Sequence, residues 1–199
     1  MVKCILKGSD TMKRYIAAVL SLVMLTGCQV SGGSQSAKPT SQAVKADRDN
    51  VPAVRFIKHI DANEYTSDVS TMSFIDSEGK WCVTDNSELM ALSNAALTEK
   101  YAAGELKGYT VQAEVDRDKL AETYDMICEA AESEDYDLIY PEMMPDVEAS
   151  TTTVSAMYCT TDGELKSIVI YENKCMTPIH SNCPAADEAY DWYRNALKK

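Results

Sequence analysis

The segment that most constrains this chain is an apolar run at residues 15–25, YIAAVLSLVML, which directly follows Lys13 and Arg14. A basic start, a short apolar run and small residues after it are typical of a secretion signal. The run is too short to span a bilayer, which takes about 20 apolar residues in a helix. The segment therefore predicts export of the chain rather than a membrane-spanning anchor.

The apolar run ends in Leu25-Thr26-Gly27-Cys28. This stretch resembles the lipobox of bacterial lipoproteins, in which a leucine and two small residues precede a cysteine. The resemblance implies cleavage before Cys28, a thioether-linked diacylglycerol on its sulfur and acylation of the new amino end. Two or more acyl chains anchor a protein stably, so the resemblance implies a lipid-anchored protein of the bacterial cell envelope. Gln29, where an aspartate would indicate retention in the inner membrane, resembles a signal for the outer membrane, facing the periplasm.

The signal divides the chain into three parts. Residues 1–27 are expected to be the signal peptide, and residues 1–11 are interpreted as an artefact of an upstream start, because Met12 directly precedes the basic pair. Residues 28–50 contain the lipidated cysteine and a polar stretch without aromatic residues, which predicts a flexible tether. Residues 51–199 are long enough for a single globular domain with a core of its own.

The chain is strongly acidic, with 19 basic and 31 acidic residues. Cleavage before Cys28 removes four basic residues and one acidic residue, which leaves 15 basic and 30 acidic residues and a formal charge of −15. Binding to nucleic acid depends on clustered lysine and arginine, and no such cluster occurs. A basic protein or a divalent cation is the kind of partner that this charge attracts.

The acidic residues are concentrated between Lys119 and Lys166, where twelve acids and no lysine or arginine occur. Three interpretations remain open: a solvated surface, a docking surface for a cationic protein, or a calcium site. The segment 134–137 is dense in carboxylates but lacks the spacing and glycine of an EF-hand loop. No metal site or cofactor is therefore assigned.

An apolar strip accompanies these acids in the proline-broken segment LIYPEMMPDV, residues 138–147. Methionine packs adaptably and is frequent at permissive binding surfaces. Either the segment folds back onto the core, or it forms an apolar anchor within an acidic rim. On the second interpretation, the partner-binding residues are Glu134, Asp135, Asp137, Tyr140, Met143 and Met144.

Five cysteines follow Cys28, and an exported protein lies in an oxidising compartment where disulfides persist. Cys175 and Cys183 bracket KCMTPIHSNCP, which reads as a loop rich in turn-forming residues, and a disulfide between them is predicted. Of the remaining three thiols, Cys82 and Cys128 are predicted to pair and one to stay free. No C-x-x-C motif occurs, so neither a thioredoxin-like site nor a zinc ribbon is indicated.

The domain is predicted to belong to the α+β class, with an antiparallel sheet built from two hairpins and flanking strands and packed against about three helices. The hairpins are expected at residues 69–84, turning at Gly79, and at residues 151–173, turning at Asp162-Gly163. Further strands are expected at residues 53–60 and 108–115. The helices are expected at residues 85–103, 116–133 and 184–199.

Motifs of catalysis are lacking in the sequence. No nucleophile elbow, P-loop, H-E-x-x-H or dinucleotide-binding fingerprint occurs, and His59 and His180 are isolated. The sequence therefore favours a non-catalytic role in binding or assembly at the envelope, with a basic protein as partner. The alternative is a lipid-tethered hydrolase or ligand-binding enzyme of the periplasm, which would require a pocket holding one of the histidines beside a carboxylate.

Overall fold

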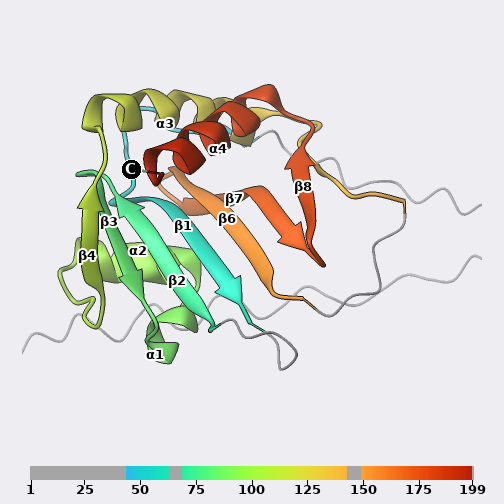
Figure 1. The fold of residues 1–199 in the computed structure, drawn as a ribbon. Coiled ribbons are helices and arrows are strands. Elements are labelled where there is room, and N and C mark those ends of the chain that lie inside the picture. Colours follow the sequence, from blue (N-terminus) through green and yellow to red (C-terminus); the bar gives the residue numbers. More distant parts are fainter. Residues whose placement is uncertain (1–43, 63–68, 143–148, 199) are drawn as a thin grey trace, which may run out of the picture. The chain divides into compact units, whose positions relative to one another are not determined.

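The computed structural model describes residues 44–62, 69–142 and 149–198, which form one eight-stranded antiparallel sheet and four helices (Figure 1). This architecture confirms the predicted α+β class. The strand order across the sheet is β4-β3-β2-β1-β6-β7-β8-β5. In chain order the elements are β1 Val54–Asp61, β2 Thr71–Asp76, β3 Lys80–Thr84, α1 Ser87–Met90, α2 Asn94–Ala102, β4 Thr110–Glu114, α3 Arg117–Glu132, β5 Leu138–Ile139, β6 Thr151–Cys159, β7 Leu165–Lys174, β8 Thr177–Ser181 and α4 Pro184–Ala196.

Both predicted hairpins are present, as β2–β3 and β6–β7. Gly79 and Gly163 both adopt a φ near +85°, which L-residues rarely adopt and glycine adopts without strain. At Gly79 space is limiting as well, because a Cβ atom there would lie 2.8 Å from the carbonyl oxygen of Val115. The glycines at these two turns, which can be recognised in the sequence, therefore determine where both hairpins form.

Strand β1 lies at the centre of the sheet and is paired with β2 on one side and β6 on the other. A β-bulge interrupts its pairing with β2 between Val54 and Phe56, with Arg55 as the extra residue. Because of the bulge, Phe56 packs against one face of the sheet, whereas Val54 and Ile57 belong to the core on the other. Arg55 is buried beneath α3, with its guanidinium carbon 4.3 Å from the centre of the Tyr124 ring.

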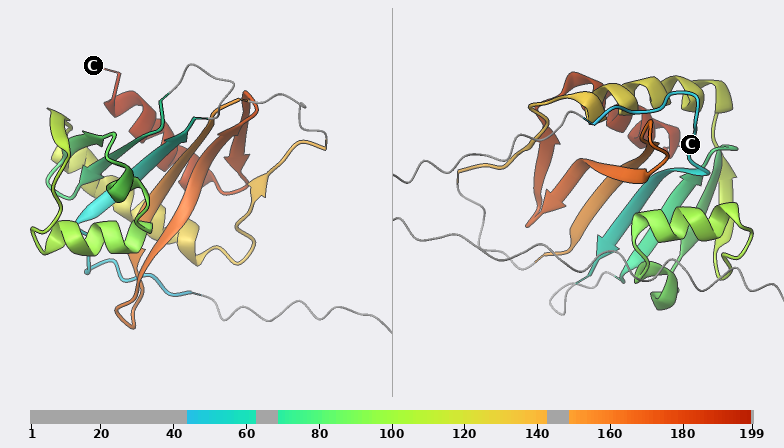
Figure 2. Two further views of the ribbon diagram at one scale, coloured as in Figure 1. Left: turned by 90° about the horizontal axis from the view of Figure 1, so that it is seen from below. Right: turned by 180° about the vertical axis from the view of Figure 1, so that it is seen from behind.

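Helices cover both faces of the sheet, as Figure 2 shows from two further directions. Helices α3 and α4 enclose the larger hydrophobic core, which includes Phe56, Ile127, Ile170 and Tyr193. Helices α1 and α2 cover a smaller core on the opposite face, and the strands that contribute buried residues to it are β1, β2, β3 and β6. Strand β4 lies at the margin of the larger core, since it is the terminal strand and all five of its residues are exposed.

The helix predicted over residues 85–103 is two helices in the structure, α1 and α2. The side chain of Ser93 accepts a hydrogen bond from the backbone N–H of Ala96 and so begins a new helix inside the predicted one. The other two helices are confirmed. Asp116 caps the N-terminus of α3 and Pro184 is the first residue of α4.

The segment between Cys175 and Cys183 differs from the predicted loop. Residues Thr177–Ser181 form strand β8, which pairs with β7 in a third hairpin. Its tip consists of Cys175 and Met176, which have φ values of 51° and 60°. This geometry usually takes glycine or asparagine, so the sequence contains no recognisable hairpin signal here.

Residues 44–50, which the sequence assigns to the tether, pack onto the domain. Ala46 is buried and forms an isolated bridge with Thr160, and the N–H of Asp47 donates a 2.8 Å hydrogen bond to the Cys159 carbonyl. Arg48 binds both carboxylate oxygens of Glu132 on α3, at 3.0 and 2.8 Å. The packed domain therefore includes residues before the predicted boundary at Val51, whereas residues 28–43 lie outside the described part.

The carboxylate of Asp76 stabilises the β2–β3 hairpin and its contact with α2. Asp76 is 1% exposed and accepts hydrogen bonds from the backbone N–H groups of Glu78 and Lys80 and from the Tyr101 hydroxyl. We expect Asp76→Ala to lower the free energy of unfolding by about 2–4 kcal/mol, because three donors lose a buried charged acceptor. Tyr101→Phe removes one of these bonds and should cost about 1–2 kcal/mol. Urea unfolding measures both, and an effect of Asp76→Ala no larger than that of Tyr101→Phe would contradict this role.

Candidate functional site

The predicted partner-binding segment lies along the β5 edge of the sheet. Tyr136 is half-buried and anchors it, and its hydroxyl donates a hydrogen bond to the Val169 carbonyl. Burial raises the pKa of this phenol. Asn182, just after β8, holds the segment through its side-chain amide, which bonds the backbone of Asp135 and Asp137. Leu138 and Ile139 then pair with Ser181 and His180 as strand β5.

This arrangement turns the acidic side chains outward. Glu134, Asp135 and Asp137 are exposed, and Ile139 and Tyr140 are 61% and 51% exposed. The Tyr140 hydroxyl donates a 2.7 Å hydrogen bond to the Glu172 carboxylate, which raises the pKa of Tyr140. The structure therefore brings four of the six predicted binding residues together on one edge. Met143 and Met144, the other two, lie outside the described residues.

Helix α3 carries further acids along its length. Glu122, Asp125 and Glu129 are exposed on its outer side. Glu132 near the end of the helix is paired with Arg48, whose hydrogen bonds lower the pKa of the Glu132 carboxyl. The Asp125 carboxylate also lies within ion-pair distance of Arg48, 3.9 Å from its Nε atom. Part of the acidic stretch therefore binds Arg48 and so holds residues 44–50 on the domain, and the rest is exposed to solvent.

Neither predicted disulfide is formed, because all five cysteines of the described part are free. Cys175 and Cys183 lie at opposite ends of β8, and five strand residues at about 3.3 Å each keep their Cα atoms beyond the limit of about 7 Å for a disulfide. Cys82 and Cys128 belong to the cores on opposite faces of the sheet. Both pairings are corrected for these geometric reasons.

Burial also keeps three of these thiols protonated and unreactive. It raises the pKa of Cys82 to about 11 and also raises the pKa values of Cys128 and Cys159. A protonated thiol is a poor nucleophile and a poor metal ligand. Cys175, at the tip of the β7–β8 hairpin, is half-buried, whereas the other four are buried.

The two histidines lie apart from each other. His59 is half-buried on β1, with its Nε2 atom 3.3 Å from the amide oxygen of Asn94. His180 is exposed on β8 and packs against the rings of Tyr171 and Tyr190. Neither histidine lines either of the two cavities described below.

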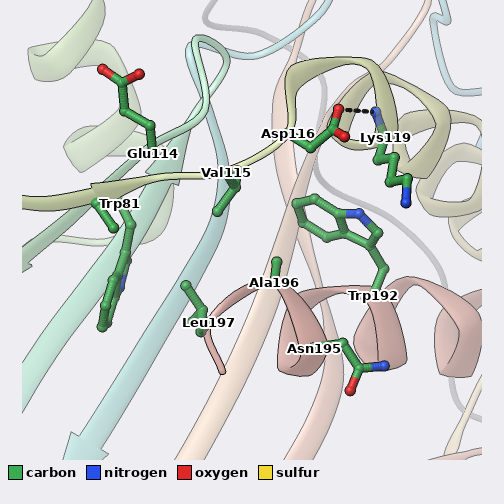
Figure 3. Close-up of a pocket in the computed structure, with 10 residues that line it drawn as sticks. Trp81, Glu114, Val115, Asp116, Lys119, Trp192, Asn195, Ala196 and Leu197 are labelled. Carbon is green, nitrogen blue, oxygen red and sulfur yellow. Dashed lines mark hydrogen bonds between the residues drawn. The ribbon is translucent and has the colours of Figure 1, made fainter. Parts of the chain in front are cut away.

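A cavity of about 270 Å³ opens beside β4, at the opposite end of the sheet from β5 (Figure 3). No sequence motif predicts it. It lies between strands β3 and β4, the start of α3 and the last turn of α4. Its lining residues are Trp81, Ala113, Glu114, Val115, Asp116, Lys119, Trp192, Asn195, Ala196 and Leu197. The chain contains two tryptophans, and both line this cavity. That rarity is the one sequence signal that could have indicated it.

The two indoles occupy opposite sides of the cavity, with Ala196 and Leu197 between them (Figure 3). Trp192 stacks on Phe56, with ring centres 5.6 Å apart, so the larger core fixes its position. Trp81 is half-buried on β3, opposite Ala113 of β4, and its Nε1 atom has no hydrogen-bond partner in the part of the chain that the structure describes. Packing rather than hydrogen bonding therefore holds Trp81 in place.

Polar groups surround these rings. The Asp116 carboxylate accepts hydrogen bonds from the backbone N–H groups of Asp118 and Lys119, and Glu114 is exposed on β4. Lys119 contributes an ammonium group, and Asn195 contributes an amide whose oxygen accepts a 3.3 Å hydrogen bond from Lys198. The cavity thus combines aromatic walls with both donors and acceptors.

A second hollow, of about 450 Å³, lies between α1, α2 and residues 105–108. Its lining includes Leu89, Leu92 and Leu106, with charged residues of both signs around them. Within residues 44–62, 69–142 and 149–198, no three or more His, Cys, Asp or Glu side chains are grouped to hold a metal ion. None of the described helices has the length and apolar character to cross a membrane.

Comparison with known proteins identifies one feature. The prokaryotic membrane lipoprotein lipid attachment site matches residues 12–29, which include Cys28. Neither the curated proteins nor the solved structures contain a match to the chain. The match establishes a lipid-anchored protein of the bacterial envelope, and what the globular domain does must be inferred from its own residues.

The free thiols give a direct check of the cysteine geometry. In the folded protein we expect a maleimide to label Cys175 rapidly and the four buried cysteines slowly, because burial limits access of the reagent. In denaturant without reductant, all five should be labelled. Mass spectrometry counts the adducts, and three or fewer adducts on the denatured chain would show that a disulfide forms.

Proposed function

We propose that this membrane-anchored bacterial lipoprotein is a non-catalytic binding module, and that the β5 edge of its domain docks a basic protein. The observation that carries the proposal is an exposed apolar pair, Ile139 in the edge strand β5 and Tyr140 directly after it. The carboxylates of Glu134, Asp135 and Asp137 flank this pair. An apolar centre within a charged rim is the usual composition of a docking site.

Electrostatics supports a basic partner. The mature chain has a formal charge of −15, and the β5 segment falls within the stretch of sequence that contains no lysine or arginine. Such a field speeds the encounter with a cationic surface and disfavours acidic competitors. The edge strand also leaves backbone groups of β5 available to a partner strand.

The hydrolase alternative has less support. A hydrolytic site places a base within hydrogen-bond reach of a nucleophile and beside a cavity. His59 has an amide neighbour, and His180 is exposed among tyrosines, so neither has that setting.

Capture from envelope extract tests the docking surface, with the lipoprotein purified from membranes in non-ionic detergent as bait. A basic protein should be recovered at about 0.05 M salt and lost at about 0.5 M, because salt screens exposed charges. The triple variant Glu134→Gln, Asp135→Asn, Asp137→Asn should weaken recovery about tenfold at low salt.

The matched control is Glu88→Gln, Glu99→Gln, Glu105→Gln, which removes the same charge from exposed acids of the α1–α2 side. It should leave recovery within about twofold of the unmodified protein. Equal losses in the two triple variants, or recovery insensitive to salt, would contradict docking at the β5 edge.

We also propose that the lipoprotein resides in the outer membrane, which Gln29 supports because an aspartate at this position would favour the inner membrane. In a diderm host, the unmodified protein should sediment with the outer-membrane fraction on a sucrose gradient. Gln29→Asp should move it to the inner-membrane fraction, and Gln29→Asn serves as the uncharged control. If the unmodified protein and both variants all sediment with the inner-membrane marker, this assignment is wrong.

A further inference from the structure

We propose that the tryptophan-lined cavity beside β4 is a binding site for one ring of a neutral saccharide. The cavity lies at the opposite end of the strand order from the β5 edge, so this proposal is independent of the docking function. Its volume of about 270 Å³ is slightly below the range of about 300–1,000 Å³ for drug-sized ligands, which suits a single pyranose ring.

The aromatic walls favour a ring with an apolar face. The indole of Trp81 is seen edge-on in Figure 3, with one face turned towards Leu197 and the cavity. The face of an indole is electronegative, and the polarised C–H groups on one side of a pyranose pack favourably against it. Trp192 provides a second aromatic surface already fixed by Phe56, so little side-chain entropy is lost on binding.

The polar lining favours hydroxyl groups over a charged ligand. Glu114 and Asp116 carry acceptors at the rim of the cavity, whereas Lys119 and the amide nitrogen of Asn195 carry donors. The Glu114 carboxylate points away from the two indoles in Figure 3, and because it is exposed it is free to turn towards a bound ring. Hydroxyls both donate and accept, so they can bond groups of either kind. The two carboxylates are offset by the ammonium groups of Lys119 and of Lys198, which hydrogen-bonds Asn195. This near balance gives neither a cation nor an anion a clear electrostatic advantage.

Access to the cavity supports binding from solution. All five residues of β4 are exposed, and β4 is the terminal strand of the sheet. The helix layer ends here, since α3 starts at Arg117 and α4 stops at Ala196. A longer saccharide with one ring in the cavity would extend past the exposed edge strand β4.

Intrinsic fluorescence gives a selective test, because both tryptophans of the chain line the cavity. The full mature lipoprotein in non-ionic detergent is titrated with the tetramers of N-acetylglucosamine and of glucose. At least one tetramer should change the emission saturably, whereas sorbitol, which has hydroxyls but no ring, should not. Calorimetry supplies the affinities of variants that lack a fluorophore.

Substitutions at the cavity, compared with one elsewhere on the domain, show where the saccharide binds. Trp81→Ala and Glu114→Gln should each weaken it about tenfold or more, and Trp81→Phe should retain it within about threefold. Glu114 is exposed, so its replacement tests the cavity without disturbing the core. Glu99→Gln, on the exposed side of α2, should leave the affinity unchanged. Cosedimentation with isolated cell-wall glycan then distinguishes a polymeric from a free saccharide as the source.

Three results would overturn the proposal. The first is the absence of a saturable response to either tetramer. The second is an affinity that Trp81→Ala and Glu114→Gln leave unchanged. The third is saturable binding of arginine amide in place of the tetramers, which would assign the cavity to a cationic side chain.

Discussion

The pairing of β1 with β6 is the interaction on which the rest of the structure depends. It joins the β1–β4 half of the sheet to the half formed by β6, β7, β8 and β5, and more than 90 residues of chain separate the paired residues Phe56 and Ala156. The two strands bring residues of both halves into shared cores, with Phe56 beside Tyr193 on one face and Ile57 in the same cluster as Met157 on the other. The bulge at Arg55 shifts the alternation of side chains along β1, so that Val54 and Phe56, two residues apart, belong to cores on opposite faces.

Two surfaces follow from how helices cover this sheet. The α3–α4 layer is centred on β6 and β7, which leaves room for the indole-lined cavity at β4 and places the acid-flanked strand β5 at the other margin. Both surfaces lie at sheet edges, where backbone and side chains remain accessible. The two candidate surfaces therefore lie at separate edges of one sheet.

Local chemistry made much of the fold predictable. The hairpins at Gly79 and Gly163 and the helix starts at Asp116 and Pro184 follow from turn and capping residues that the sequence shows directly. Strand β8 was missed because its turn uses Cys175 and Met176 where glycine or asparagine is usual. The disulfides were predicted wrongly because sequence spacing does not reveal which sheet face a cysteine occupies, or that a strand separates two of them.

The two candidate surfaces were predictable to different extents. The acidic segment is continuous in sequence, so its charge and its apolar pair Ile139 and Tyr140 could be recognised before the structure was known. The cavity draws residues from β3, β4, α3 and α4, which only long-range pairing brings together. The lipid attachment site could be predicted without any knowledge of the fold, since it consists of adjacent residues.

The claim on which the whole account rests is attachment to the membrane through Cys28, and the mass of the mature N-terminal peptide tests it most directly. Protein extracted from membranes, digested and measured by mass spectrometry should give a peptide that begins at Cys28 and carries the mass of a thioether-linked diacylglycerol. An unmodified Cys28, or a mature chain that begins at another residue, would contradict it.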